Sequence, residues 1–168
     1  MSDAPVASAA VVPWGDFAAD RPDFASEVRE RFEAHPHHVL ATVRRDGRPR
    51  VNGTNVMFGD GILWLGTMTG SRKAADLSRD PRCALHSAPL EEDLGSGDGD
   101  ATIDAVARTL GDADAVDLLR GEFGDDATLD GAVWSLSLRT VAVVEVRGEQ
   151  LRIRSWTPAG GLTEVLRD

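Results

Sequence analysis

A stretch near the start of the chain contains strand-favouring segments separated by two tight-turn signals, and this pattern constrains the fold most. Residues 39–43 are rich in strand-favouring side chains, Asp46-Gly47 is a strong hairpin turn, and residues 50–58 continue as a second predicted strand. Gly59-Asp60-Gly61 then turns the chain into a third predicted strand at 62–67. Because strands joined by such short turns pair antiparallel, the sequence predicts a three-stranded antiparallel meander.

Helices and further strands are predicted elsewhere in the chain. A first helix is predicted between Asp20 and Pro36, since Phe24, Val28 and Phe32 recur at helical spacing. The other predicted elements are a short helix capped by Ser71, strands at 83–85 and 101–110, a helix at 112–123, and a terminal hairpin of 141–146 and 151–156. Strands do not alternate with long helices, so we expect an α+β fold with a closed or partly closed antiparallel barrel, not a doubly wound sheet.

The composition is that of one globular domain. The chain has 168 residues, 42% of them hydrophobic, which is enough for one core but not for a second full domain. We expect residues 1–18 to be a flexible leader and residues 19–168 to form the single domain. Residues 1–13 lack the basic start and long apolar stretch of a signal peptide, and Cys83 has no second cysteine to pair with. We therefore expect a cytoplasmic protein.

The distribution of charge excludes some partners and suggests another. The formal net charge of −10 disfavours nucleic acid and anionic membranes, because Lys and Arg side chains bind both. The basic residues are nevertheless concentrated in one stretch, whereas residues 91–130 are strongly acidic. The concentrated residues are Arg44, Arg45, Arg48, Arg50, Arg72, Lys73, Arg79 and Arg82. This asymmetry predicts a local anion-binding site on an acidic protein.

The most informative segment joins the predicted strand at 62–67 to the helix that begins with Ser71, Arg72 and Lys73. The free N–H groups and the dipole of a helix start attract anions, and each charge-assisted hydrogen bond contributes about 1.5–3 kcal/mol. The alternative interpretation is that Ser71 only caps the helix and that the basic side chains are solvated. Basic residues in a first turn oppose the helix dipole unless an anion compensates, so we favour the anion site.

Other motifs do not predict chemistry of their own. Gly66 and Gly70 lack the spacing of a Walker loop, and the glycine-rich run at 95–99 follows no predicted strand as a dinucleotide fingerprint would. The histidine cluster at 35–38 lacks the i, i+4 spacing of a ligating pair, so we predict surface polar residues and no metal site. No Ser/His/Asp arrangement follows from the spacing, so hydrolysis is not predicted.

Several motifs together resemble a known family. They are the segments 40–51 (LATVRRDGRPRV), 63–67 (LWLGT), 71–73 (SRK) and 80–85 (DPRCAL). In combination they resemble the pyridoxamine 5'-phosphate oxidase-like superfamily of flavin-binding split barrels, well over residues 24–87 and more loosely over 141–156. The resemblance implies a six-stranded antiparallel split β-barrel with short flanking helices. It also implies a homodimer with a cofactor at each of two sites in the subunit interface.

The resemblance further implies which residues bind the cofactor, usually flavin mononucleotide (FMN). The residues expected at its phosphate and ribityl chain are Thr67, Met68, Ser71, Arg72 and Lys73. Those whose backbone would run beside the ring are Arg50, Val51, Asn52, Gly53 and Thr54. Trp156 would reach the site of the partner. No catalytic residue is assigned.

The implied function is that of an FMN-binding oxidoreductase that transfers hydride to or from an unknown small molecule or a nicotinamide. Oxidation of pyridoxamine 5'-phosphate itself is not implied, because residues 51–54 lack the Leu-Leu-Lys-like ending of the true oxidase. The Asp-Gly-x-Pro turn at 46–49 and the Ser-x-Lys signature at 71–73 are shared with relatives that bind a deazaflavin coenzyme, so a deazaflavin-dependent reductase is one alternative. A non-catalytic flavin- or haem-binding module is the other.

Overall fold

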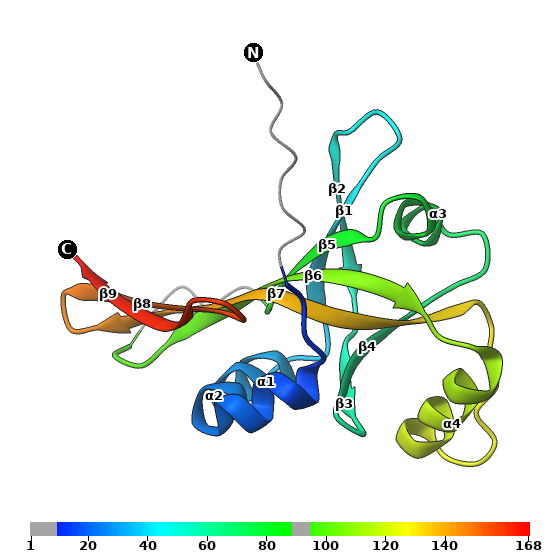
Figure 1. Ribbon diagram of the computed structural model, residues 1–168, viewed down its shortest axis with the longest axis horizontal. Helices are drawn as coiled ribbons and strands as arrows, with labels where there is room; N and C mark the ends of the chain where they lie inside the picture. The colour runs from blue at the N-terminus through cyan, green and yellow to red at the C-terminus, as the bar shows by residue number, and fades with distance from the viewer. Residues whose placement is uncertain (1–9, 89–94) are drawn as a thin grey trace.

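The computed structural model describes residues 10–88 and 95–168, which form one nine-stranded antiparallel sheet with four helices (Figure 1). The helices are α1 (Trp14–Asp20), α2 (Pro22–Glu33), α3 (Arg72–Arg79) and α4 (Asp112–Phe123). The strands are β1 (His38–Val43), β2 (Pro49–Thr54), β3 (Met57–Gly59), β4 (Ile62–Thr67), β5 (Arg82–His86), β6 (Gly99–Thr109), β7 (Ala132–Arg147), β8 (Gln150–Thr157) and β9 (Gly161–Arg167). No helix in the described ranges is long and apolar enough to cross a membrane.

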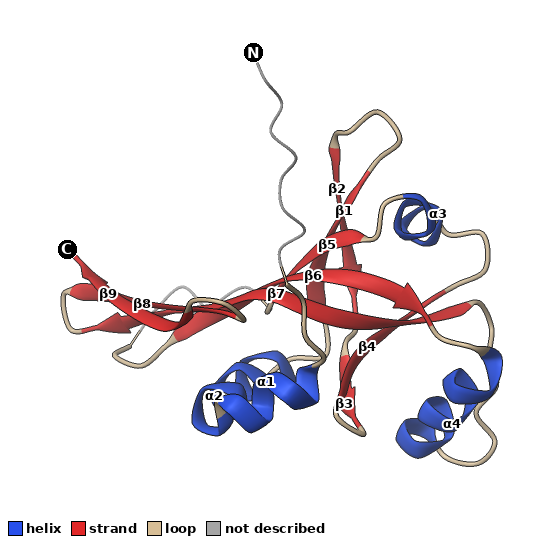
Figure 2. Cartoon of the chain, in the orientation of Figure 1, coloured by secondary structure: helices blue, strands red, loops and turns tan. Residues whose placement is uncertain are grey.

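The sheet forks at its longest strand. Its order is β2-β1-β5-β6-β7-β4-β3, and β8 and β9 extend it from β7. Strand β7 has 16 residues, so the edge that does not face β6 pairs with β4 in its first part and with β8 in its second part (Figure 2). Among the described strands no ladder joins β2 to β3, so the sheet is not closed. The α+β class and the antiparallel pairing are confirmed, whereas the structure has an open sheet of nine strands where we expected a barrel of six.

The predicted three-stranded meander is wrong. The second predicted strand at 50–58 is interrupted after Thr54, and its two parts become β2 and β3. Among the described strands β2 pairs only with β1, while β3 pairs with β4, so β2 and β3 lie at opposite ends of the strand order. Alternation of side chains predicts a strand but not its neighbour, because any strand edge offers the same backbone groups.

The N-terminal part of the domain begins earlier than predicted. Trp14 and Phe17 of α1 are buried, and Val12 forms a β-bridge with Leu138. Residues 12–18 of the predicted leader are therefore part of the fold, because two large aromatic side chains there bury apolar surface. The first nine residues of that leader lie outside the described residues.

The hydrophobic core consists of two clusters, to both of which β4 and β7 contribute residues. The main cluster packs α1 and α2 against the sheet and includes Phe24, Val28 and Phe32, which confirms the predicted face of the first helix. Cys83 belongs to the same cluster and is buried. A smaller cluster packs α4 against β4 and β7 and includes Trp64. The predicted helix at 112–123 is confirmed, and it packs beside β3 and the first part of β4.

Gly131 holds the connection between β4 and α3 in place, and we expect its replacement by alanine to be costly. The residue has φ +113°, and a Cβ would lie 1.9 Å from the carbonyl oxygen of Thr67. The variant Gly131→Ala must shift backbone atoms and adopt a strained φ, so we expect a loss of about 3 kcal/mol in the free energy of unfolding. Urea denaturation measures this loss. The control Gly121→Ala changes an exposed position of helix α4 where an added Cβ would meet nothing within 4 Å, and it should gain about 0.5–1 kcal/mol. Equal stability of Gly131→Ala and the unmodified chain would contradict the expectation.

Candidate functional site

A pocket of about 450 Å³ lies where the sheet is left open, between the end of edge strand β2 and strands β3 and β4. Gly53, Thr54 and Asn55 contribute one wall, and Lys73 of α3 lies beside them. Residues of β3, β4 and α4 form the opposite wall. The volume is in the range of pockets that bind small molecules or cofactors.

The polar end of the pocket is built around Lys73. Its Nζ donates a hydrogen bond of 3.1 Å to the carbonyl oxygen of Gly53, and β2 is an edge strand whose outer backbone groups face no neighbouring strand. Burial lowers the pKa of Lys73 from its usual value, because the ammonium group loses part of its hydration. No carboxylate of the described residues lies within ion-pair distance of this ammonium group. A partly desolvated cation with one neutral acceptor favours binding of an anion.

The start of helix α3 has the predicted cap. Ser71 is the N-cap, and its hydroxyl oxygen accepts a hydrogen bond of 3.4 Å from the backbone N–H of Ala74. Arg72 follows as the first helical residue, is exposed, and has no side-chain hydrogen bond to another described residue. Its guanidinium group is therefore free to turn toward a ligand, although it does not line the pocket.

A buried ion pair fixes α3 against the sheet. The Asp76 carboxylate accepts hydrogen bonds from Arg50 Nε (2.6 Å), Thr42 Oγ1 (3.1 Å) and Arg79 (3.3 Å). Burial alone would raise the pKa of Asp76, but the hydrogen bonds from Arg50, Thr42 and Arg79 outweigh burial and lower that pKa. The carboxylate is therefore ionised at neutral pH and ties α3 to β1 and β2. Because this ion pair positions α3, it also positions Lys73, which lies in the first turn of that helix.

The other end of the pocket is apolar. Trp64 of β4 and Phe123 of α4 meet edge to face with ring centroids 6.4 Å apart, and Met57 and Leu119 complete this wall. Phe123 is 62% exposed, so part of this apolar wall is accessible to solvent. Planar ligands pack well against such a wall. The pocket thus combines a cationic end with an apolar, aromatic end.

The structure brings some of the predicted cofactor-binding residues together. Gly53, Thr54 and Lys73 line the pocket. Arg50 lies next to it along β2 but is engaged with Asp76, and Asn52 has a buried Nδ2 with no partner among the described residues.

Other predicted residues are placed away from the pocket or already have partners. Val51 and Met68 are 67% and 71% exposed and do not line it. The Thr67 hydroxyl accepts a hydrogen bond of 2.9 Å from Trp134 Nε1 and donates one to the carbonyl of Ala132, so its bonds are made within the protein. Trp156 is only 3% exposed, packs on Phe17 and donates to Asp20. The position predicted for Trp156 at a partner's site is therefore corrected: its indole lies in the core of its own chain.

The sequence interpretation missed the residues of the apolar wall and a polar pair at the rim. Trp64 lies in the predicted strand at 62–67, and Leu119 and Phe123 lie in the predicted helix at 112–123, but none of them was predicted at a binding site. His37 was interpreted as a surface residue, but it lines the pocket, and its Nδ1 lies 2.8 Å from Asn55 Oδ1. The one sequence feature that could have indicated Asn55 as a pocket residue is its position as a polar residue directly after β2. Among the described residues no group of three or more His, Cys, Asp or Glu side chains is placed to hold a metal ion.

Comparison with solved structures shows the same fold at low sequence identity. PhzG from Burkholderia lata, in complex with tetrahydrophenazine-1-carboxylic acid, is 13% identical with a TM-score of 0.64, covering 93% of each chain. A pyridoxamine 5'-phosphate oxidase-related, FMN-binding protein from Nostoc punctiforme is 15% identical with a TM-score of 0.58, covering 88% of this chain and 96% of that one. HutZ, the haem storage protein from Vibrio cholerae, is 20% identical with a TM-score of 0.53, covering 71% and 90%.

Comparison at the level of sequence families identifies the chain. None of the curated proteins matches it. The profile of the family described as pyridoxamine 5'-phosphate oxidase matches residues 24–152, which include β1 to β7 and the whole pocket. The motifs at 40–51, 63–67, 71–73 and 80–85 all lie inside this range. The chain therefore belongs to the pyridoxamine 5'-phosphate oxidase family.

Proposed function

We propose that the protein is an FMN-binding oxidoreductase whose cofactor occupies the pocket between β2 and β4. The observation that carries the proposal is the division of this pocket into two ends. One end has the partly desolvated ammonium of Lys73, and the other has the apolar wall that includes Trp64 and Phe123. FMN has the matching division, with a phosphate at one end and a planar ring at the other.

Each part of the site has a role in this proposal. Lys73, Arg72 and the start of α3 hold the phosphate, and the backbone of β2 from Arg50 to Thr54 runs beside the ring with its outer edge unpaired. The flavin supplies the redox chemistry when it is bound. The protein positions it and excludes water through the apolar wall. A small organic molecule or a nicotinamide is the proposed redox partner, and the cytoplasm the proposed location.

A second copy of the chain is the proposed partner, with the cofactor at the interface. The side of β2 that carries the exposed Val51 continues onto β1, since Val51 pairs with Ala41. An apolar hollow of about 280 Å³ lies on this same face over β1, β5, β6 and β7 and includes Val39, Ala41 and Ala84. A second copy seated there would cover both the hollow and Val51. Light scattering should then give twice the chain mass of 18.0 kDa.

Two alternatives follow from specific observations. A haem-binding module without turnover is favoured by the likeness to HutZ, a haem storage protein. A deazaflavin coenzyme is the second, since it also combines a planar ring with a phosphate, which the two ends of the pocket would accept equally well.

The absorption spectrum of the freshly purified protein tests the proposal. A flavin spectrum, with FMN released on denaturation, is the expected result. A haem Soret band or a deazaflavin band would identify the corresponding alternative. A colourless protein that binds none of the three ligands in titrations would refute the proposal. If FMN is bound, reduction by NADH or NADPH separates an oxidoreductase from a binding module.

A further inference from the structure

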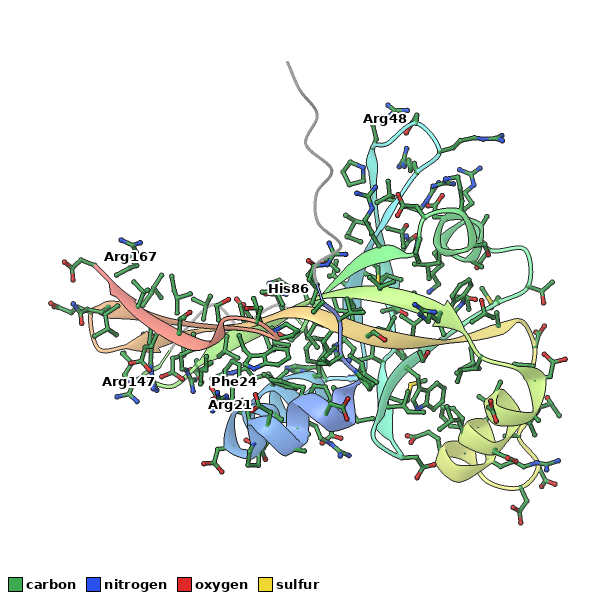
Figure 3. All side chains as sticks on the ribbon, viewed as in Figure 1. Arg21, Phe24, Arg48, His86, Arg147 and Arg167 are labelled. Carbon is green, nitrogen blue, oxygen red and sulfur yellow. The ribbon has the colours of Figure 1, made fainter. Side chains whose placement is uncertain are left out.

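A second hollow, of about 470 Å³, lies on the β1–β2 hairpin beside α3. It is lined by Arg44, Arg45, Asp46, Arg50 and Asp76, and none of these residues lines the pocket between β2 and β4. The hairpin tip projects from the sheet next to α3, and Arg48 lies at this tip (Figure 3). The function proposed above does not use this hollow.

The hollow has more positive than negative charge, although the chain has a net charge of −10. Both of its carboxylates are already neutralised by arginines. Asp46 is paired with Arg48 at 2.7 Å, and Asp76 with Arg50 at 2.6 Å and with Arg79 at 3.3 Å. Hydrogen bonds from Arg48 are the main reason that the pKa of Asp46 is lowered, so this carboxylate stays with its arginine. The positive charges of Arg44 and Arg45 are therefore not neutralised by either carboxylate of the hollow.

These two arginines have no side-chain hydrogen bond or ion pair within the described part of the chain. Arg44 is half-buried, and its Nε is buried with no partner. A buried unpaired N–H on a cation is costly, and an anion in the hollow would satisfy it. The turn itself is well formed, with Arg44 N donating to Arg48 O at 2.8 Å and Gly47 at φ +81°. The arginines are therefore presented by a rigid hairpin.

The two anion-binding positions are connected by β2. Arg50 lines the hollow and Gly53 lines the pocket, three residues apart, which is about 10 Å along a strand. An extended ligand could therefore lie along this edge strand with one anionic group at Lys73 and another at the hairpin.

We propose that the hairpin hollow is a second anion subsite that receives a phosphate or carboxylate of an extended ligand whose ring lies in the pocket. The ligand class rests on the function proposed above, but the anion site itself does not. The second anionic group comes either from a cofactor longer than FMN or from a nucleotide redox partner.

The test uses the double variant Arg44→Gln/Arg45→Gln of the full chain. Neither side chain bonds to another described residue, so the fold should be retained, which circular dichroism checks. Calorimetric titration with tripolyphosphate should show binding to the unmodified chain at least about 10-fold tighter than to the variant. The matched control Arg108→Gln/Arg167→Gln removes the same charge from two exposed arginines elsewhere and should bind like the unmodified chain.

Nucleotide titrations then identify the source of the second anion. FMN affinity should be equal in the unmodified chain and the variant. A variant that loses affinity for FAD indicates a longer cofactor, and one that loses affinity for NADPH but not NADH indicates a 2'-phosphate of the redox partner. If tripolyphosphate and all nucleotides bind the variant and the unmodified chain equally, the proposal is overturned. Failure of the unmodified chain to bind FMN refutes only the proposed function, since the tripolyphosphate result stands independently.

Discussion

Replacing Lys73 with alanine is expected to weaken FMN binding roughly 10- to 150-fold, because one charge-assisted hydrogen bond to a phosphate contributes about 1.5–3 kcal/mol. The Nζ group of Lys73 stands at the polar end of the pocket, with the carbonyl of Gly53 as its hydrogen-bond acceptor. The fold should be unaffected, since the side chain makes no ion pair with the described residues. Quenching of flavin fluorescence on titration measures the affinity.

Further variants distinguish the contribution of the positive charge of Lys73 to FMN affinity from that of the shape of its side chain. Lys73→Arg keeps the positive charge and should retain more affinity than Lys73→Ala. The double variant Arg72→Ala/Lys73→Ala should lose more, because Arg72 at the first position of α3 can also reach a phosphate. Arg108→Ala, an exposed arginine on β6, is the control. Unchanged FMN affinity in Lys73→Ala would show that the phosphate does not lie at this end of the pocket.

The variant Asp76→Asn should lower the free energy of unfolding by about 3 kcal/mol at neutral pH, since removing one partner of a buried ion pair leaves the other charge unpaired. The Asp76 side chain is 6% exposed and accepts hydrogen bonds from Arg50, Thr42 and Arg79. Urea denaturation at pH 7 measures the loss. The control Asp125→Asn lies on an exposed turn after α4 and should change stability by less than about 0.5 kcal/mol.

The loss in Asp76→Asn should depend on pH in a definite direction. The pKa of Asp76 is lower in the folded protein than in the unfolded chain, where it is about 3.9. Its contribution is therefore fully present above about pH 5 and is lost as the pH falls through the folded pKa. The difference between the variant and the unmodified chain should be constant from pH 5 to 8 and shrink below about pH 4. A difference below about 1 kcal/mol at pH 7 would show that the ion pair does not anchor α3.

The sequence by itself determined the features that depend on near neighbours in the chain. The turn at Asp46-Gly47, the Ser71 cap and the bounds of α4 all followed from residues within a few positions of each other. Their energies come from local backbone conformation and local hydrogen bonds, which a sequence pattern reports directly. The family resemblance rested on the same local motifs and is confirmed over residues 24–152.

Only the tertiary structure decided which of these features meet. It placed β2 and β3 at opposite ends of the strand order, opened the pocket between them, and brought Phe123 from a distant helix to the rim of that pocket. In the folded chain the Thr67 hydroxyl accepts a hydrogen bond from Trp134, and Trp156 is buried against Phe17. Neither side chain is therefore available to bind a cofactor as predicted. The physical reason is that strand pairing and side-chain packing depend on contacts between residues far apart in the chain. Alternation and helical spacing report which face a residue occupies, but not what lies opposite that face.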